Sequence, residues 1–124
     1  MFGWFRRSRI EIIVSDADTI WVGEEKYRLA GYDAPEITHA KSDHEREMGE
    51  QAAERLRELV APPNRVKLKV LPGADIHQRG LARLYINGRD VAKIAVEEGW
   101  GVPFDGERRR SDEMPDWSQM RYPR

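Results

Sequence analysis

Two groups of acidic residues lie on either side of a single arginine near the start of this chain. The first group is Asp16-Ala17-Asp18-Thr19, the second is Asp33-Ala34-Pro35-Glu36, and Arg28 lies between them. Carboxylates that converge on one point bind a hard cation, and a neighbouring guanidinium binds the phosphate that such a cation activates. If the fold brings the two groups together, the sequence predicts a metal-dependent phosphodiesterase.

The composition restricts the chemistry that such a site can use. The 124 residues are enough for one domain with a hydrophobic core. The chain has no cysteine, which excludes disulfides, thiolate metal sites and cysteine nucleophiles. Its three histidines do not have the spacing of zinc ligands. Any metal would therefore be bound by oxygen. The net charge of −1 argues against tight non-specific binding of nucleic acid but allows a local basic cleft.

The N-terminal segment, residues 1–9, is aromatic and then basic. It lacks the apolar region of a signal peptide, and no later stretch is apolar enough to span a membrane. We expect an edge segment here, with a trimmed leader or a weak membrane-surface contact as the alternatives. The sequence predicts a soluble monomer and leaves its compartment open.

The elements that must position the acidic groups are short strands. Residues 10–22 predict two strands joined by a polar turn at Ser15-Asp16-Ala17-Asp18, and Lys26 to Tyr32 predicts a third, which together would form an antiparallel meander. Strict alternation over Arg65 to Leu71 predicts a fourth strand with a basic outer face. Leu81 to Ile86 predicts the fifth.

A long helix is predicted between the third and fourth strands. Ser42 followed by Glu45 is a capping-box pattern, and Pro62-Pro63 would end the helix. Apolar residues recur at helical spacing along one face: Met48, Ala52, Leu56, Leu59 and Val60. We interpret the charged opposite face as solvated surface.

The C-terminal part predicts one more helix and a tail. Asp90 and Gly99 are the expected start and stop of a short helix after the fifth strand. Residues 103–124, rich in charge, Pro and Gly, predict an irregular or partly disordered tail. The expected fold class is therefore α+β, mainly β with helices. Five strands, with a long helix between the third and fourth strands, is the element order of an OB-type barrel.

Three blocks of this sequence, in order and spacing, resemble the staphylococcal nuclease (thermonuclease) family. They are Asp16-Ala17-Asp18-Thr19, then Tyr27-Arg28-Leu29 leading to Asp33-Ala34-Pro35-Glu36, then Asp75 with Arg79-Gly80-Leu81. The resemblance covers residues 10–102 and implies a five-stranded OB-fold. It also implies a Ca²⁺-dependent endonuclease that hydrolyses single-stranded or frayed DNA and RNA with little sequence preference and leaves 3′-phosphate ends.

The resemblance implies a metal site made of oxygen ligands. Asp18 and Asp33 match the carboxylates that bind Ca²⁺ in the family. Ala34 stands where the family usually has threonine, and alanine keeps the backbone carbonyl that binds the metal but lacks the hydroxyl. Two or three protein oxygens completed by water suit Ca²⁺ better than a transition metal.

The resemblance also assigns the catalytic roles. Glu36 matches the acid beside the attacking water, whose proton it would accept or which it would orient. Arg28 and Arg79 match the arginines that contact the scissile phosphate, where their charge would stabilise the five-coordinate transition state. His77 is a candidate for contact with a nucleotide.

The periphery of the site departs from the family pattern. His77-Gln78 replaces a tyrosine-glycine pair, and Ile76 stands where a lysine is found. The tyrosines expected after the second helix have no counterpart near Phe104-Asp105-Gly106. These departures concern substrate affinity and rate and leave the catalytic set intact.

Several alternatives remain at the sequence level. Asp16 and Asp18 are also ordinary turn residues, and Asp16 would then add only negative potential or a hydrogen bond to the site. Two alternatives concern the function of the whole chain. One is a non-catalytic OB module that binds nucleic acid or a protein partner, and the other is a nuclease restricted to short substrates. A binding module has no use for the acids and arginines together, because unpaired carboxylates repel a phosphate backbone, and their joint presence favours the enzyme.

Overall fold

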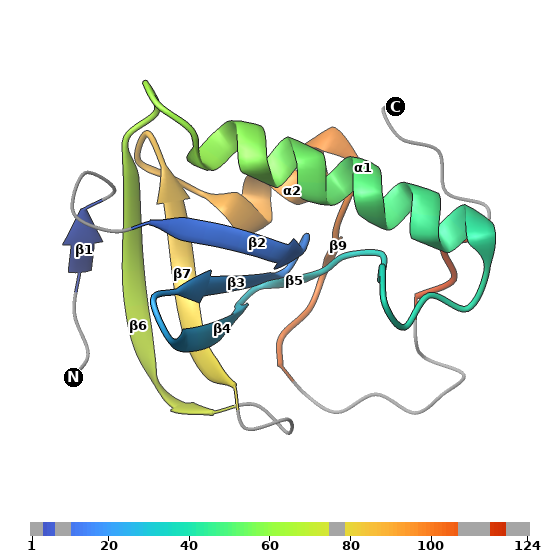
Figure 1. The fold of residues 1–124 in the computed structure, drawn as a ribbon, viewed down its shortest axis with the longest axis horizontal. Coiled ribbons are helices and arrows are strands. Elements are labelled where there is room, and N and C mark those ends of the chain that lie inside the picture. The colour runs from blue at the N-terminus through green and yellow to red at the C-terminus, as the bar shows by residue number, and fades with distance from the viewer. Residues whose placement is uncertain (1–3, 7–10, 75–78, 107–114, 119–124) are drawn as a thin grey trace.

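The computed structural model describes residues 4–6, 11–74, 79–106 and 115–118. Within these residues the chain has mixed α+β structure with two helices and a sheet of several strands (Figure 1). The strands are β1 (Trp4–Arg6), β2 (Ile12–Asp16), β3 (Thr19–Val22), β4 (Glu25–Leu29), β5 (Tyr32–Asp33), β6 (Val66–Ala74), β7 (Gly80–Ile86), β8 (Arg89–Asp90) and β9 (Val102–Pro103). The helices are α1 (Asp43–Val60) and α2 (Val91–Glu98).

The main sheet is built on an antiparallel meander. Its strand order is β1-β6-β7-β4-β3-β2, with β8 paired to β7, and a second sheet consists of β5 and β9. β2, β3 and β4 pair antiparallel in sequence, as the sequence predicts, and β4 then pairs parallel with β7. Because β1 and β2 end the order, the sheet of the described residues is not closed. The closed five-stranded barrel stays a prediction.

The strand predicted from Lys26 to Tyr32 is in fact two strands. β4 ends at Leu29, and β5 begins at Tyr32 after a turn in which Gly31 has a φ of +100°. Residues other than glycine rarely adopt this backbone conformation. The chain turns at Gly31 instead of continuing the strand. The turn directs β5 away from β4, and Tyr32 and Asp33 pair with Pro103 and Val102 of β9.

Helix α1 covers the sheet from one side and lies across β2 (Figure 1). The hydroxyl of its N-cap residue, Ser42, accepts a hydrogen bond from the N–H of Glu45 (3.0 Å). The apolar face that the sequence indicates is buried: Met48, Ala52, Leu56, Leu59 and Val60. Helix α2 begins after its N-cap Asp90 and ends at Gly99.

The chain outside the predicted domain also takes part in the fold. Strand β1 of the N-terminal segment pairs antiparallel with β6. In the segment predicted as a tail, Pro103 belongs to β9, and residues 115–118 have no regular structure. Trp117 is nevertheless buried, so part of this segment packs on the domain. In the described part of the chain, neither helix is long and apolar enough to cross a membrane.

Candidate active site

Asp18 lies in the turn between β2 and β3, with only 5% of the residue exposed. Its Oδ2 accepts a hydrogen bond from the backbone N–H of Ala34 (3.2 Å) and lies 3.3 Å from Nη1 of Arg28. Its Oδ1 accepts a hydrogen bond from the hydroxyl of Thr19 (3.1 Å). The Asp18 carboxylate therefore joins the two acidic groups of the sequence.

Arg28 lies in β4 between the two acidic groups and is 8% exposed. Its Nη2 forms an ion pair with Asp33, and its Nη1 donates a hydrogen bond to the carbonyl of Leu29 (2.9 Å). The guanidinium carbon lies 5.6 Å from the centre of the Phe104 ring, a cation–π distance. A buried guanidinium needs partners for its charge and its N–H groups, and here Asp18 and Asp33 are the partners.

The turn at Gly31 brings Asp33 to this position. The N–H of Leu29 donates to the carbonyl of Asp18 (2.8 Å), which fixes the end of β4 to the turn that carries Asp18. After the turn, the hydroxyl of Tyr32 donates to the carbonyl of Ala17 (2.5 Å). Both ends of the turn are therefore fastened to the segment around Asp18.

Arg79 approaches the same cluster from the start of β7. Its Nη1 donates a hydrogen bond to the hydroxyl oxygen of Thr19 (3.1 Å), and that hydroxyl in turn donates to Asp18. Thr19 thus connects the second arginine to the carboxylate that already contacts Arg28. The structure thus brings together four of the predicted site residues: Arg28, Arg79, Asp18 and Asp33.

Glu45 of α1 holds the loop that carries Glu36. Its carboxylate accepts hydrogen bonds from the backbone N–H groups of Glu36 and Lys41, both at 3.0 Å, and the residue is 6% exposed. In the predicted capping box this carboxylate would bond back to the N–H of Ser42. Its position across the loop instead fixes the backbone of Glu36. Asp16 adds a further bond, since its Oδ1 accepts from the N–H of Ile37 (3.2 Å).

The environment of Glu36 favours the protonated carboxyl. Burial is the largest cause and raises its pKa from 4.5 to about 7. The negative charges of Asp18 and Asp16 act in the same direction, whereas the positive charge of Arg28 opposes them. A carboxyl group with a pKa near neutrality can take up and release a proton under physiological conditions.

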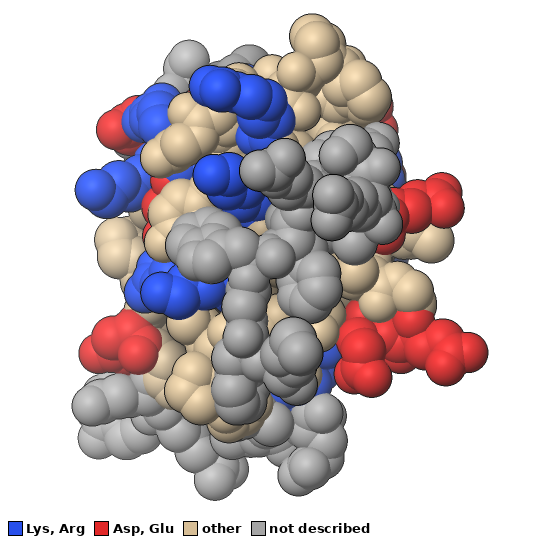
Figure 2. Space-filling model, turned by 90° about the vertical axis from the view of Figure 1, so that its left-hand side faces the viewer, with Lys and Arg blue, Asp and Glu red and all other residues tan. Residues whose placement is uncertain are grey.

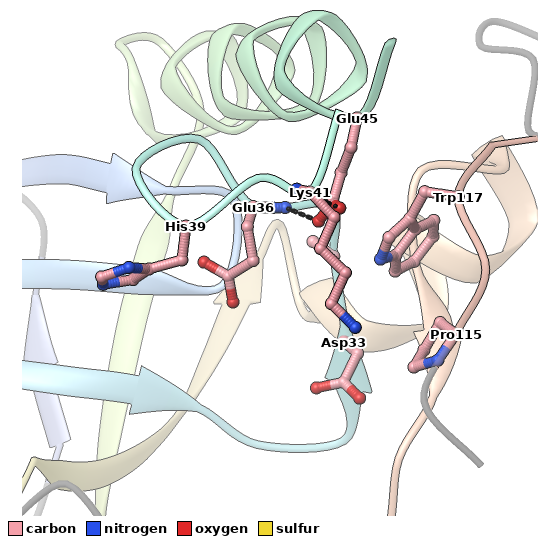
Figure 3. A pocket seen from close by; sticks show the side chains of 8 residues that line it. Asp33, Glu36, His39, Lys41, Glu45, Pro115 and Trp117 are labelled. Atoms are coloured by element: carbon pink, nitrogen blue, oxygen red, sulfur yellow. Dashed lines mark hydrogen bonds between the residues drawn. The ribbon is translucent and has the colours of Figure 1, made fainter. Parts of the chain in front are cut away.

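A small pocket of about 80 Å³ lies beside Glu36 (Figure 3). The side chains of Glu36 and Lys41 extend from the same loop, Asp33 lies beyond the end of Lys41, and Trp117 faces them (Figure 3). The residues that line the pocket are Asp33, Ala34, Glu36, His39, Lys41, Glu45, Pro115 and Trp117. The pocket therefore lies between the second acidic group and the C-terminal segment.

The two aspartates supply carboxylate oxygens, the donor type that hard cations prefer. Among the described residues, no group of three or more His, Asp or Glu side chains is arranged to hold a metal ion. Asp18 and Asp33 nevertheless direct carboxylate oxygens to a single cationic group, the guanidinium of Arg28. With peptide carbonyls and water to complete the shell, this donor chemistry fits Ca²⁺ and not a metal that prefers nitrogen or sulfur.

The other predicted residues are placed less directly. Ala34 is buried, and its N–H donates to Asp18. His77 lies outside the described residues. His39, interpreted from the sequence as a surface residue, is exposed but also lines the pocket.

Sequence patterns did not indicate three of the residues at the site. Thr19 bridges Arg79 and Asp18, and Phe104 lies over Arg28, although neither role follows from local spacing. Trp117 closes one side of the pocket, and a lone tryptophan within a polar, charged tail was the available signal.

A comparison with protein families finds a match over most of the chain. The family described as staphylococcal nuclease homologue matches residues 26–121, which include Arg28, Asp33, Glu36 and Arg79. The first acidic group, with Asp16 and Asp18, lies just before the matched residues. The comparison with curated proteins found no match.

Proposed function

This chain belongs to the staphylococcal nuclease family, and on that premise we propose that it is a Ca²⁺-dependent nuclease. It hydrolyses phosphodiester bonds in single-stranded or frayed DNA and RNA with little sequence preference and leaves 3′-phosphate ends. Family membership supports a hydrolase that acts on nucleic acid. The geometry around Arg28 supports the more specific assignment.

The observation that carries this proposal is the convergence of Asp18 and Asp33 on Arg28, next to a pocket that contains Glu36. A phosphodiester is itself an anion and therefore resists attack by hydroxide or water. Hydrolysis needs positive charge at the phosphate and a proton acceptor for the water. This cluster has groups suited to both needs.

Asp18, Asp33 and the backbone carbonyl of Ala34 are the residues that would hold Ca²⁺. When bound, Ca²⁺ supplies positive charge that offsets the negative charge developing on the phosphate oxygens. Arg28 and Arg79 bind the same oxygens through their planar N–H groups. Because arginine stays protonated near neutral pH, Arg79 stabilises charge and does not donate the proton.

Glu36 accepts the proton of the attacking water or orients that water. The water oxygen forms a bond to phosphorus, and the bond from phosphorus to the 5′ oxygen breaks. The 5′ oxygen takes up a proton from solvent water and leaves as a hydroxyl group, so that the phosphate stays on the 3′ side. The hydrogen bonds from Glu45 and Asp16 to the loop keep the Glu36 backbone in place for this step.

The proposal extends to the fold. The meander of β2, β3 and β4, its parallel pairing with β7, and the long α1 support an OB-type barrel as the core. In this description β1 and β9 are additions to that core.

A calcium titration of the cleavage rate tests the metal assignment. Asp18→Asn removes the charge of one ligand but keeps an oxygen for hydrogen bonding, so the Ca²⁺ concentration for half-maximal cleavage should rise about ten-fold or more. Asp43→Asn, at an exposed position in the first turn of α1, is the matched control and should titrate like the unmodified protein. An unchanged titration of a folded Asp18→Asn variant would refute the site.

A further inference from the structure

Four neighbouring strands of the main sheet share one face that is turned away from the core. Along each strand, side chains alternate between the two faces, and residues paired between strands lie on the same face. Lys69 pairs with Arg83, Leu81 pairs with Arg28, and Arg28 pairs with Thr19. These pairs trace a continuous surface over β6, β7, β4 and β3, which we call the outer face.

Five basic residues occupy positions on the outer face. Its basic residues are Lys26, Arg28, Lys67, Lys69 and Arg83. No aspartate or glutamate occupies an outer-face position of these four strands, although the chain as a whole has a net charge of −1. Acidic residues from outside these strands pair with two of the five cations: Asp18 and Asp33 with Arg28, and Asp90 with Arg83 (2.8 Å). Lys26, Lys67 and Lys69 are the other three.

The view of the molecule from the side of β1 and β6 agrees with this distribution. Figure 2 shows Lys and Arg side chains gathered on that side and Asp and Glu toward its margins. Lys67 and Lys69 of β6 are both exposed. These two lysines of the outer face are thus placed where a ligand can reach them.

Aromatic side chains accompany the cations on the outer face. Trp21 and Tyr85 are partly exposed there, and Nζ of Lys26 lies 5.5 Å from the centre of the Trp21 ring. Cations bind the phosphates of a single strand, and aromatic rings stack on its bases whatever their identity. Both kinds of contact are needed to hold single-stranded nucleic acid without sequence preference.

We propose that the outer face is a binding track for single-stranded nucleic acid, which continues from the scissile phosphate at Arg28 across β7 to Lys69 and Lys67. Two strand spacings, about 10 Å, separate the strand of Arg28 from that of the two lysines. The track therefore binds nucleotides that flank the cleaved bond. This inference rests on the proposed function, because the position of the scissile phosphate is taken from it.

The test compares two doubly substituted proteins with the same change in charge. Lys67→Gln/Lys69→Gln removes two cations of the outer face. Arg46→Gln/Lys93→Gln removes two exposed cations from α1 and α2 and is the control. Binding of a labelled single strand of about 20 nucleotides, longer than the site of one OB-type module, is measured by fluorescence anisotropy. A chelator in the buffer prevents cleavage.

The outer-face variant should bind the strand about ten-fold more weakly at low salt. Its slope of log affinity against log salt should be shallower by about 1.4, because each lost phosphate contact in a single strand contributes roughly 0.7. The control should match the unmodified protein in both respects. Equal affinity and slope for the two variants would overturn the binding track.

A dinucleotide substrate separates this inference from the proposed function. A dinucleotide is too short to extend along the outer face, so both variants should cleave it at the rate of the unmodified protein. If the unmodified protein cleaves neither the dinucleotide nor the longer strand with Ca²⁺, the proposed function fails. The anisotropy result still decides whether the outer face binds the strand.

Discussion

At the scale of single residues, the candidate site keeps strong charges away from water. Asp18 and Arg28 are only 5% and 8% exposed, and each contacts more than one polar partner. Electrostatic interactions are stronger in such an environment than in water, and a buried charge that loses its partner is costly. Glu36 differs from them, because its surroundings favour the neutral form.

The raised pKa of Glu36 predicts how the stability of the metal-free protein depends on pH. The folded state binds this proton more tightly than the unfolded state, so the stabilisation is fully present below pH 4.5 and is lost as the pH rises through about 7. Glu36→Gln cannot titrate and should lack this part of the pH dependence. Urea denaturation of both proteins with a chelator, at about pH 5 and about pH 8, measures the difference. Identical pH dependence would contradict the raised pKa.

At the scale of elements, α1 positions the loop that carries Glu36 in two ways. Glu45 binds two backbone N–H groups of the loop, and Gly49 allows the loop to approach the helix. A Cβ atom at Gly49 would lie 2.7 Å from the carbonyl oxygen of Glu36, which is too close for any unstrained contact. A glycine inside a helix lowers its stability, and here it permits the contact that places Glu36.

Gly49→Ala should therefore lower activity although alanine favours the helix. The helix gains about 1 kcal/mol of intrinsic propensity, but the backbone of Glu36 must shift, and a displacement of this kind costs up to about 100-fold in turnover. Gln51→Ala, at an exposed position of the same helix, should leave turnover unchanged. Turnover and thermal stability of the two variants are measured side by side. Full activity of Gly49→Ala would mean that this close approach is not needed.

The elements also show which features follow from local sequence. The start of α1 at Ser42 and its end before Pro62 follow from capping and from proline, both of which act within a few residues. The break at Gly31 does not follow from local sequence, because glycine is compatible with a strand. The turn there is fixed by contacts between residues far apart in the sequence, such as that of Tyr32 with Ala17.

The grouping of the site residues was also predictable only in part. The residue types around Arg28 indicate the chemistry only if the two acidic groups meet, which the resemblance implies, and the structure brings Asp18 and Asp33 to that arginine. The contacts of Phe104 and Trp117 come from segments far away in the sequence, so no local pattern indicates them. The roles of these residues in catalysis and metal binding stay predictions.

At the scale of the whole molecule, one polar cluster joins the two helices to the end of the domain. Arg55 of α1 donates two hydrogen bonds to the carboxylate of Glu98 in α2, each at 2.8 Å. The indole N–H of Trp100, which is completely buried, donates to the same carboxylate (2.8 Å). Glu98 therefore connects α1, α2 and the segment that leads to β9.

Glu98→Gln should destabilise the protein by about 1 kcal/mol at neutral pH, since its charged hydrogen bonds are partly exposed to solvent. The bond from Arg55 is the main cause that lowers the pKa of Glu98. The stabilisation is therefore present above the ordinary value of 4.5 and is lost as the pH falls below it. Urea denaturation at about pH 7 and about pH 3 measures both effects.

The matched control for this prediction is Glu97→Gln. Glu97 forms an exposed ion pair with Arg89, and exposed pairs contribute little to stability. If the two substitutions destabilise the protein equally, the cluster at Glu98 has no special role in holding the helices together.

The measurement that tests the nuclease assignment most directly is cleavage of a labelled single-stranded DNA, with Ca²⁺ or with a chelator, by the unmodified protein and by Glu36→Gln. Glu50→Gln, at an exposed position in α1, is the control for the loss of a carboxylate. We predict cleavage that requires Ca²⁺, is unaffected in the control, and falls about 10²- to 10⁴-fold in Glu36→Gln. Cleavage by folded Glu36→Gln at the unmodified rate, or no cleavage by the unmodified protein with Ca²⁺, would contradict the proposed function.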